Sequence, residues 1–194
     1  MPNISNYPYG FQYGVNIRGI PLTVAHPGQV YWVSNSSVLS HNARSGSDGN
    51  DGSYQSPFAT IAYALTRCTA SRGDIIMVKP GHAESVSAAA GIILSVAGVA
   101  IVGLGYGSMR PTITLDTANT ATITVTANNV TVHNILFKAN FLNIATCFSI
   151  ANAQVANDFV VYSCEFRDNS VILNFVSCVK VGTTANIAEG LTLT

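Results

Sequence analysis

Short apolar strands recur about every thirty residues in the second half of this sequence, and this recurrence constrains the fold more than any other feature. One series of strand-like segments starts at residues 98, 129, 158 and 189, so the starts lie 31, 29 and 31 residues apart. A second series starts at residues 91, 121, 147 and 175, with spacings of 30, 26 and 28. No helical pattern separates the members. Such a pattern is typical of a solenoid, in which one coil cannot bury its apolar face until another coil stacks on it.

The recurrence predicts an all-β, right-handed parallel β-helix, a solenoid whose coils each contain about 30 residues. An antiparallel β-sandwich would have similar strand lengths and turn residues, but it does not predict the recurrence. Asparagine and threonine suit the corners between strands, because asparagine tolerates left-handed backbone and both side chains can form ladders along the stack. We expect the following residues at the corners: Asn119, Asn128, Asn129, Asn140, Asn157, Asn169, Thr183 and Thr184.

Three segments follow one another along the chain. Residues 1–42 predict an extended N-terminal arm, because they are rich in proline and aromatic residues and have little periodicity. Residues 43–72 combine a turn-rich loop with a short helix, and residues 73–194 supply the coils. The last strand-like segment reaches Thr194 without a capping helix. We therefore expect a partner subunit or further residues to complete that end of the solenoid.

A short amphipathic helix is predicted in front of the coils, from Pro57 to Leu65. Ser56 offers an N-cap hydroxyl, and proline suits the first helical position. Such a helix can cover the first coil and protect its strand edges. Its apolar face is formed by residues spaced three and four apart, namely Phe58, Ile61, Ala62 and Leu65.

The chain carries very little charge. Charged residues make up 9% of the 194 residues, compared with about 25% in ordinary globular proteins. Nine basic residues balance nine acidic ones, so we expect no nucleic-acid partner and no attraction to an anionic membrane. The uncharged stretch from Val86 to Gly107 contains five glycines, which favours solenoid strands over a bilayer span. The N-terminus also lacks the basic and then apolar pattern of a signal peptide.

No cysteine or histidine has the spacing of a metal site. Each cysteine lies in an apolar run, where a free thiol behaves as a small buried hydrophobe, so we favour reduced thiols over two disulfides. Asp48, Asn50 and Asp51 alternate as in a calcium loop, but Ala59 stands where the bidentate glutamate belongs, so we interpret them as turn caps. The sequence therefore predicts no metal and no cofactor. The residues considered are Cys68, Cys147, Cys164 and Cys178, and His26, His41, His82 and His133.

Carboxylates are sparse in the coils. Glu165, Arg167 and Asp168 form the densest charged cluster, and strand alternation places the first two on one face. A carboxylate pair with an arginine clamp is one interpretation, but we favour an exposed ion pair at a coil corner, usually worth under about 1 kcal/mol. Asp158 and Glu189 start equivalent strands and could stack one coil apart, but the other coils have no acidic residue there. We therefore predict no catalytic residues and no enzyme activity.

Three motifs resemble the start of pectin-lyase-like right-handed β-helices. They are the glycine- and aspartate-rich loop of residues 46–52, the segment SPFATI of residues 56–61, and the strand GDIIMVKPG of residues 73–81. In that family such a loop leads into a capping helix, and such a strand opens the first coil. The resemblance implies the fold and leaves the chemistry open, since this fold hosts lyases, hydrolases, adhesins and virus spikes alike.

The whole chain also resembles a group of virion proteins of tailed bacteriophages. This resemblance implies a structural protein of the virion, and we favour a capsid decoration or cement protein that binds the major capsid protein or other virion proteins. By analogy with such parts we expect a homo-oligomer, with a trimer as the usual form. A tail fibre or tailspike that binds, or also degrades, host surface glycans is the first alternative. A secreted polysaccharide lyase is the second, disfavoured by the missing signal peptide and the sparse carboxylates.

The predicted arm is the candidate partner-binding segment. It has more apolar anchors than a free tail would tolerate, and aromatic residues dominate the energetics of interfaces. Ordering of the arm is therefore expected to come from contact with a partner. The candidate anchors are Tyr7, Tyr9, Phe11, Tyr13, Ile17, Ile20, Tyr31 and Trp32.

Overall fold

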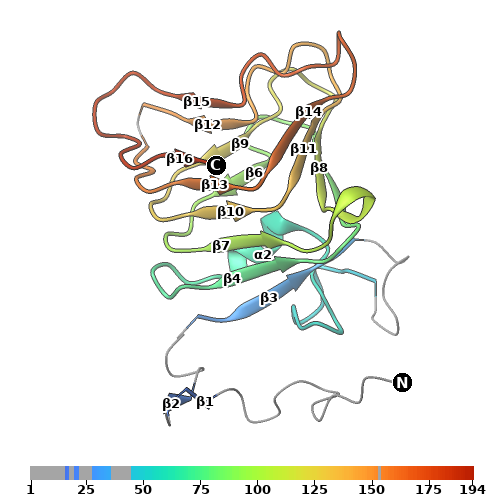
Figure 1. Cartoon of the computed structure of the whole chain (residues 1–194), viewed down its shortest axis with the longest axis vertical. Coiled ribbons are helices and arrows are strands. Elements are labelled where there is room, and N and C mark those ends of the chain that lie inside the picture. Colours follow the sequence, from blue (N-terminus) through green and yellow to red (C-terminus); the bar gives the residue numbers. More distant parts are fainter. Residues whose placement is uncertain (1–15, 18–19, 22–27, 36–44, 153) are drawn as a thin grey trace.

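The computed structural model describes residues 16–17, 20–21, 28–35, 45–152 and 154–194, and it contains a parallel β-solenoid (Figure 1). Each coil has three strands, and equivalent strands of successive coils pair in parallel. Thr131 lies between Ala100 and Val160 in neighbouring coils, which gives coil lengths of 131 − 100 = 31 and 160 − 131 = 29 residues. The predicted parallel β-helix and its repeat length are confirmed.

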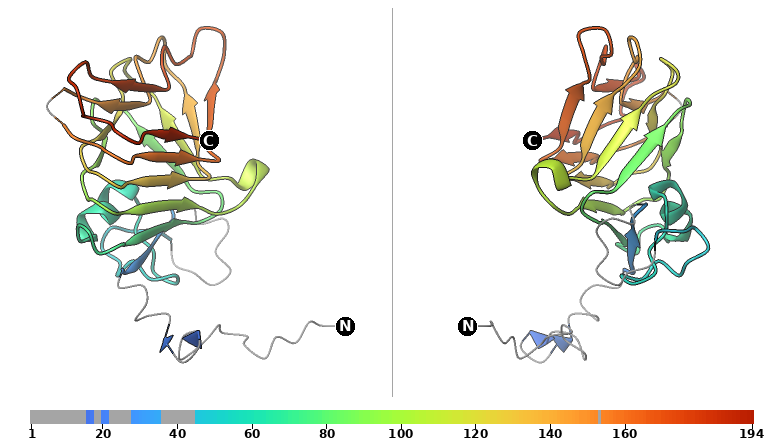
Figure 2. Two further views of the ribbon diagram at one scale, coloured as in Figure 1. Left: turned by 60° about the vertical axis from the view of Figure 1, so that its left-hand side comes forward. Right: turned by 90° about the vertical axis from the view of Figure 1, so that its right-hand side faces the viewer.

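Three sheets form the walls of the solenoid, and successive strands of each sheet come from successive coils (Figure 2). Sheet I contains β3 (Val30–Val33), β4 (Ile75–Val78), β7 (Ala100–Gly103), β10 (Thr131–His133), β13 (Val160–Tyr162) and β16 (Thr192–Leu193). Sheet II contains β5 (Ala83–Val86), β8 (Thr112–Leu115), β11 (Leu136–Ala139) and β14 (Glu165–Asp168). Sheet III contains β6 (Ile92–Leu94), β9 (Ile123–Val125), β12 (Phe148–Ile150) and β15 (Val179–Val181).

Each coil has one strand more than the two series in the sequence indicated. The segments of residues 129–137 and 158–166 look like single strands, but each contains two strands that belong to different walls. Asn134 and Ser163 separate these strands, and both have left-handed backbone, with φ of 54° and 51°. A single left-handed residue turns the chain sharply without interrupting the apolar run. Hydrophobic periodicity alone therefore merges the two strands.

The predicted asparagine ladders are present along one corner. Asn128 Oδ1 accepts a hydrogen bond from the backbone of Asn157 one coil later, at 2.9 Å. Asn157 Oδ1 accepts in turn from the backbone of Glu189, also at 2.9 Å. The next residue of each coil is left-handed, which requires glycine or a short polar side chain. These residues are Gly98, Asn129, Asp158 and Gly190.

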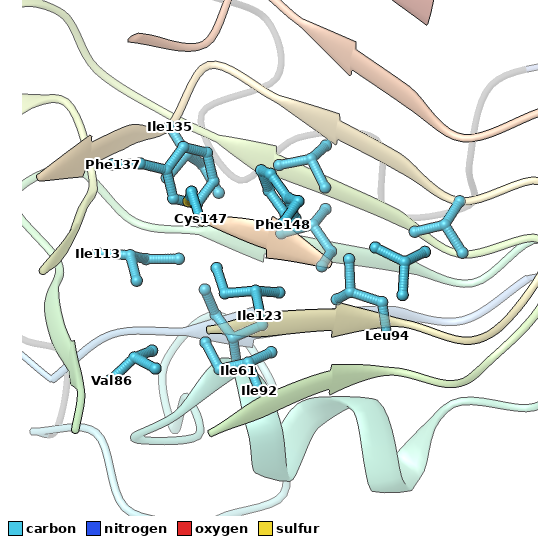
Figure 3. Close-up of a cluster of buried hydrophobic side chains, with 14 of the residues drawn as sticks. Ile61, Val86, Ile92, Leu94, Ile113, Ile123, Ile135, Phe137, Cys147 and Phe148 are labelled. Carbon is cyan, nitrogen blue, oxygen red and sulfur yellow. The ribbon is translucent and has the colours of Figure 1, made fainter. Parts of the chain in front are cut away.

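The core is a continuous column of apolar side chains inside the three walls (Figure 3). Phe148 lies at its centre, with ring centroids 4.9 Å from Phe137 and 5.3 Å from Phe159. Both contacts are edge-to-face, the arrangement that aromatic pairs prefer. Ile61 of the helix closes the column beside Ile92 at its N-terminal end.

The capping helix is confirmed, but it begins four residues later than predicted. Helix α2 spans Ile61–Arg67 and contacts β3, β4 and β6, so it covers the first coil. Thr60, and not Ser56, is the N-cap, because its side chain accepts a hydrogen bond from the backbone of Tyr63 at 3.1 Å. Phe58 forms a β-bridge with Val33, which holds it outside the helix while its ring is still buried.

The structure shortens the predicted arm. Tyr31 and Trp32 lie in β3, which pairs with β4 in parallel and extends sheet I beyond the first coil. The prediction placed these two residues in the arm, but four consecutive residue pairs join β3 to the solenoid. The backbone at Ile17 and Ile20 forms a short antiparallel pair, β1 (Asn16–Ile17) with β2 (Ile20–Pro21). The candidate anchors Tyr7, Tyr9, Phe11 and Tyr13 lie outside the described residues.

Candidate functional site

The glycine-rich loop before the helix binds the protein's own backbone. Asp48 Oδ1 accepts hydrogen bonds from the backbone of Ala59 and Thr60 at 2.9 and 3.2 Å. Asn50 donates to the carbonyl of Pro57 at 2.7 Å, and Asp51 accepts from the backbone of Ser53 at 2.9 Å. These side chains therefore act as turn caps, as predicted. Within the described ranges no group of three or more acidic, cysteine or histidine residues is placed to hold a metal ion.

Asp74, which opens the first strand of the coils, is fully buried and also has a structural role. It accepts hydrogen bonds at 2.7 Å from the backbone of Gln29 and Thr69, and from Nε and an Nη nitrogen of Arg72. Burial by itself would raise the pKa of Asp74, but the hydrogen bonds from Arg72, Thr69 and Gln29 outweigh burial and hold the pKa below its usual value. The carboxylate therefore links three segments: the residue before β3, the segment that follows α2, and the start of β4.

His82 and Glu84 form a second buried polar pair at the capped end. His82 Nδ1 accepts from the backbone of Asn35 at 3.1 Å, so the proton of the neutral ring is on Nε2, which lies 3.1 Å from Glu84 Oε2. The same Glu84 oxygen accepts a hydrogen bond from the backbone of Ile61 at the start of α2. Glu84 aligns with Ile113 of the next coil, so a carboxylate replaces a core residue where it can bind the helix. The histidine has a structural role, as predicted.

The predicted Glu165 and Arg167 pair lies on the outer face of sheet II, with a partner that the sequence did not reveal. Arg167 donates to Glu165 Oε1 through Nε and Nη2, at 2.9 and 2.6 Å. Arg110, which follows the 3₁₀ helix η1 (Gly107–Met109), donates to Glu165 Oε2 at 3.1 Å. These residues line an open hollow of about 440 Å³ beside the η1 loop.

The chemistry of this cluster is that of an ion-pair network. Both oxygens of Glu165 accept charge-assisted hydrogen bonds from arginines, so the carboxylate is paired within the protein itself. Asp168 turns away and accepts from the backbone of Phe175 at 2.9 Å. The predicted stack of Asp158 on Glu189 is not formed, because the two residues are out of register by one position. Asp158 aligns with Gly190, and Glu189 lies beside Asn157, because the register pairs Val160 with Thr192.

The remaining histidine and the thiols occupy distinct positions. His133 points outward from β10, and its ring stacks on Tyr162 of the next coil with centroids 4.9 Å apart. All four cysteines are free, as predicted. Cys147 is buried, and burial raises its pKa well above the usual value, whereas Cys178 is exposed. The expectation of a core position was therefore wrong for Cys178, because it lies in the last complete coil, which has no coil above it.

The C-terminal end of the solenoid is an open surface. Strands β14, β15 and β16 are the edge strands of the three sheets, so one side of each has no neighbour among the described residues (Figure 1). Val181 aligns with the fully buried Ile150 of the preceding coil, yet it is exposed because nothing covers it. The loop between β14 and β15 adds further exposed apolar side chains. These are Val171, Ile172 and Val176.

The two ends of the solenoid therefore differ. At the N-terminal end α2 and β3 cover the first coil, and Ile61 and Val33 are buried. At the C-terminal end, three strands have an edge without a neighbour among the described residues, and exposed apolar side chains lie on these strands and on the adjoining loop. Exposed strand edges and contiguous apolar patches are typical of surfaces that another chain segment covers. We take this end, defined by β14, β15, β16 and residues 170–176, as the candidate functional site and name it the open end.

Comparison with known proteins identifies the fold and no family. Neither a protein-family profile nor a curated protein sequence matches this chain. The solved structure of a rhamnogalacturonan lyase is similar, with a TM-score of 0.50 and 18% sequence identity over 71% of this chain. The match covers 36% of the lyase, so this chain spans about a third of that protein. At this identity the likeness concerns the β-helix fold alone. Among the described residues no helix is long and apolar enough to cross a membrane.

Proposed function

We propose that this chain is a structural component of a virus particle and not a catalyst. The observation that supports the proposal is the open end, where three edge strands and nearby exposed apolar side chains can pair with further β-structure, supplied by another subunit or by more residues of the same chain. Surfaces of this kind cost solubility in a free protein, and they are retained where an assembly covers them. The low charge of the chain fits the same role, because much of its surface would face neighbouring subunits.

The finer proposal follows the resemblance to virion proteins of tailed bacteriophages. We place the protein on the capsid shell, as a decoration or cement protein whose partners are the major capsid protein and other copies of itself. Glu165 forms ion pairs with two arginines, and Asp48 binds backbone groups of its own loop. These internal partners favour a binding role over catalysis.

Incorporation into particles tests this proposal. Ile172→Asp at the open end should reduce incorporation, because burying a charge against an apolar partner is costly. The matched control is Tyr106→Asp, which places the same charge at another exposed site, directly before the 3₁₀ helix η1. Equal incorporation of both variants and the wild type would contradict the proposed role of the open end.

A glycan-binding tail fibre or tailspike is the second candidate. The observation that favours it is the hollow on sheet II, where Arg110 and Arg167 outnumber Glu165 and leave a local excess of positive charge. The β-helix likeness to a polysaccharide lyase is consistent with a glycan-related role. Incubation of the isolated chain with host surface polysaccharide distinguishes the two: retention of the polysaccharide, or release of unsaturated products, would favour the spike.

A further inference from the structure

A second hollow, distinct from the open end, lies near the capped end of the solenoid. Its volume is about 310 Å³, and it is formed where sheet I turns toward sheet II. Four separate segments meet there: strand β3, the loop before α2, the end of β4 and the turn after β7. Its walls include Trp32, Tyr54, Lys79, Pro80, Leu104 and Met109.

Lys79 is the chemically informative residue of this hollow. Only 7% of its surface is exposed, although its side chain carries a positive charge. Its Nζ donates to the backbone carbonyl of Tyr54 and lies 4.1 Å from the centroid of the Tyr54 ring. No carboxylate of the described residues forms an ion pair with it. Burial lowers the pKa of Lys79, and no neighbouring acidic group opposes that effect.

A buried ammonium without a counter-ion is costly, and it has three donors to satisfy. The cation–π contact with Tyr54 and a single backbone acceptor compensate part of this cost. An anionic group entering the hollow would complete the arrangement, because a charge-assisted hydrogen bond is strongest where water is excluded. The hollow is therefore electrostatically prepared for an anion.

The other walls indicate what carries the anion. Trp32 and Tyr54 meet edge to face, with ring centroids 4.8 Å apart and an interplanar angle of 87°. Leu104 and Met109 add apolar surface, so the space next to Lys79 suits a flat or chair-shaped ring. Ligand pockets span about 300–1,000 Å³, and this hollow is at the lower limit, which suits one ring and not an extended chain.

We propose that this hollow binds a carboxylate carried on a six-membered ring, with Lys79 pairing with the carboxylate and Trp32 packing against the ring. Two sources share this chemistry, a sugar acid and an aromatic acid. The inference does not depend on the virion role, because the hollow and the open end lie at opposite ends of the solenoid.

Trp32 is the single tryptophan of the chain, so its fluorescence reports directly on the hollow. The full chain is titrated at pH 7 with sodium glucuronate, sodium benzoate and, as the uncharged control, glucose. We expect a saturable change with at least one carboxylate and none with glucose. A response to glucuronate alone assigns the sugar acid, and a response to benzoate alone assigns the aromatic acid.

Lys79→Met keeps the length of the side chain and removes the charge, so it should weaken carboxylate binding at least tenfold. Lys180→Met is the matched control, because Lys180 is an exposed lysine of β15 near the open end. Circular dichroism checks that both variants are folded. If Lys79→Met does not fold, amide chemical shifts of the wild type replace it, and we expect ligand-induced shifts around Tyr54, Lys79 and Leu104.

Three results would overturn the proposal. The first is the absence of a saturable response to either carboxylate. The second is binding of glucose as tight as that of glucuronate. The third is unchanged carboxylate affinity in a folded Lys79→Met variant, or amide shifts confined to other parts of the chain.

Discussion

Replacement of Asp74 by asparagine should destabilise the protein strongly, because this buried carboxylate accepts four hydrogen bonds. Asparagine keeps one acceptor oxygen, and it turns the second oxygen into an NH₂ group that faces donors. A hydrogen bond to a charged group contributes about 1.5–3 kcal/mol. Solvent reaches 32% of the Arg72 side-chain surface and screens its interaction with Asp74. We therefore assign the hydrogen bonds from Arg72 the low end of this energy range. The loss of two such bonds predicts a destabilisation of about 3–5 kcal/mol.

Urea unfolding followed by circular dichroism measures this change. With an m-value of about 2 kcal/mol per molar, the midpoint should fall by about 1.5–2.5 M. The matched control is Asp116→Asn, because the carboxylate of Asp116 accepts from the neighbouring Thr117 hydroxyl in an exposed position. This control should change stability by no more than about 0.5 kcal/mol. A loss below about 1 kcal/mol for Asp74→Asn would mean that these hydrogen bonds contribute little to stability.

The same residue predicts an acid dependence. The pKa of Asp74 in the folded state lies below the usual value of 3.8, so between these two values the unfolded chain binds more protons than the folded chain. The stabilisation is thus fully present above pH 3.8 and is lost as the pH falls through the folded pKa. The wild type should lose stability below pH 3.8 more steeply than Asp74→Asn, and parallel acid limbs would contradict this linkage.

Three further perturbations test the core, a corner and the thiols. Phe148→Ala removes the ring that contacts three other phenylalanines and should cost about 3–5 kcal/mol in urea unfolding, whereas Val171→Ala, at a residue 97% exposed, should cost almost nothing. Asn134→Ala should cost about 2–4 kcal/mol, because the amide donates to the carbonyls of Gly103 and Gly105 from a left-handed residue, and Asn134→Gly should recover only the backbone part. In the folded protein a thiol reagent should modify Cys178 first and Cys147 only on unfolding.

Each of these expectations has a clear contrary result. Equal losses for Phe148→Ala and Val171→Ala would mean that the column is not the main source of stability. Full recovery by Asn134→Gly would assign the whole effect to backbone strain and none to the two hydrogen bonds. Equal labelling rates for the two thiols would contradict the burial of Cys147.

The sequence predicted the features that repeat. The 30-residue period, the asparagine corners and the capping helix all follow from local patterns, and the structure has each of them. The third strand of each coil was missed because Asn134 and Ser163 bend the chain within a continuous apolar run. The start of the helix was misplaced because the Phe58 bridge to Val33 joins residues 25 positions apart, a contact that periodicity cannot reveal.

The sites depend on contacts between distant segments. Arg110 and Glu165 are 55 residues apart in the sequence. They meet because the stacking of coils brings the segment after η1 close to β14, which belongs to the second coil after it. Tyr31 and Trp32 were predicted to belong to the arm because β3 and β4, which pair in the structure, are separated in the sequence by a loop and a helix. The hollow at Lys79 could have been suspected from one signal, a lysine that ends an apolar strand without an acidic neighbour in sequence. The aromatic walls of the hollow could not have been predicted from the sequence, because Trp32 and Tyr54 come from separate segments.

We propose above that the solenoid is an assembly part whose open end is covered in a virus particle. A cryo-electron microscopy reconstruction of the particle tests it most directly, by locating the three-walled solenoid in the density. We expect the solenoid on the capsid shell, with the edges of β14, β15 and β16 paired to further β-structure. Density that leaves these three edges facing solvent, or particles that lack the solenoid altogether, would contradict it.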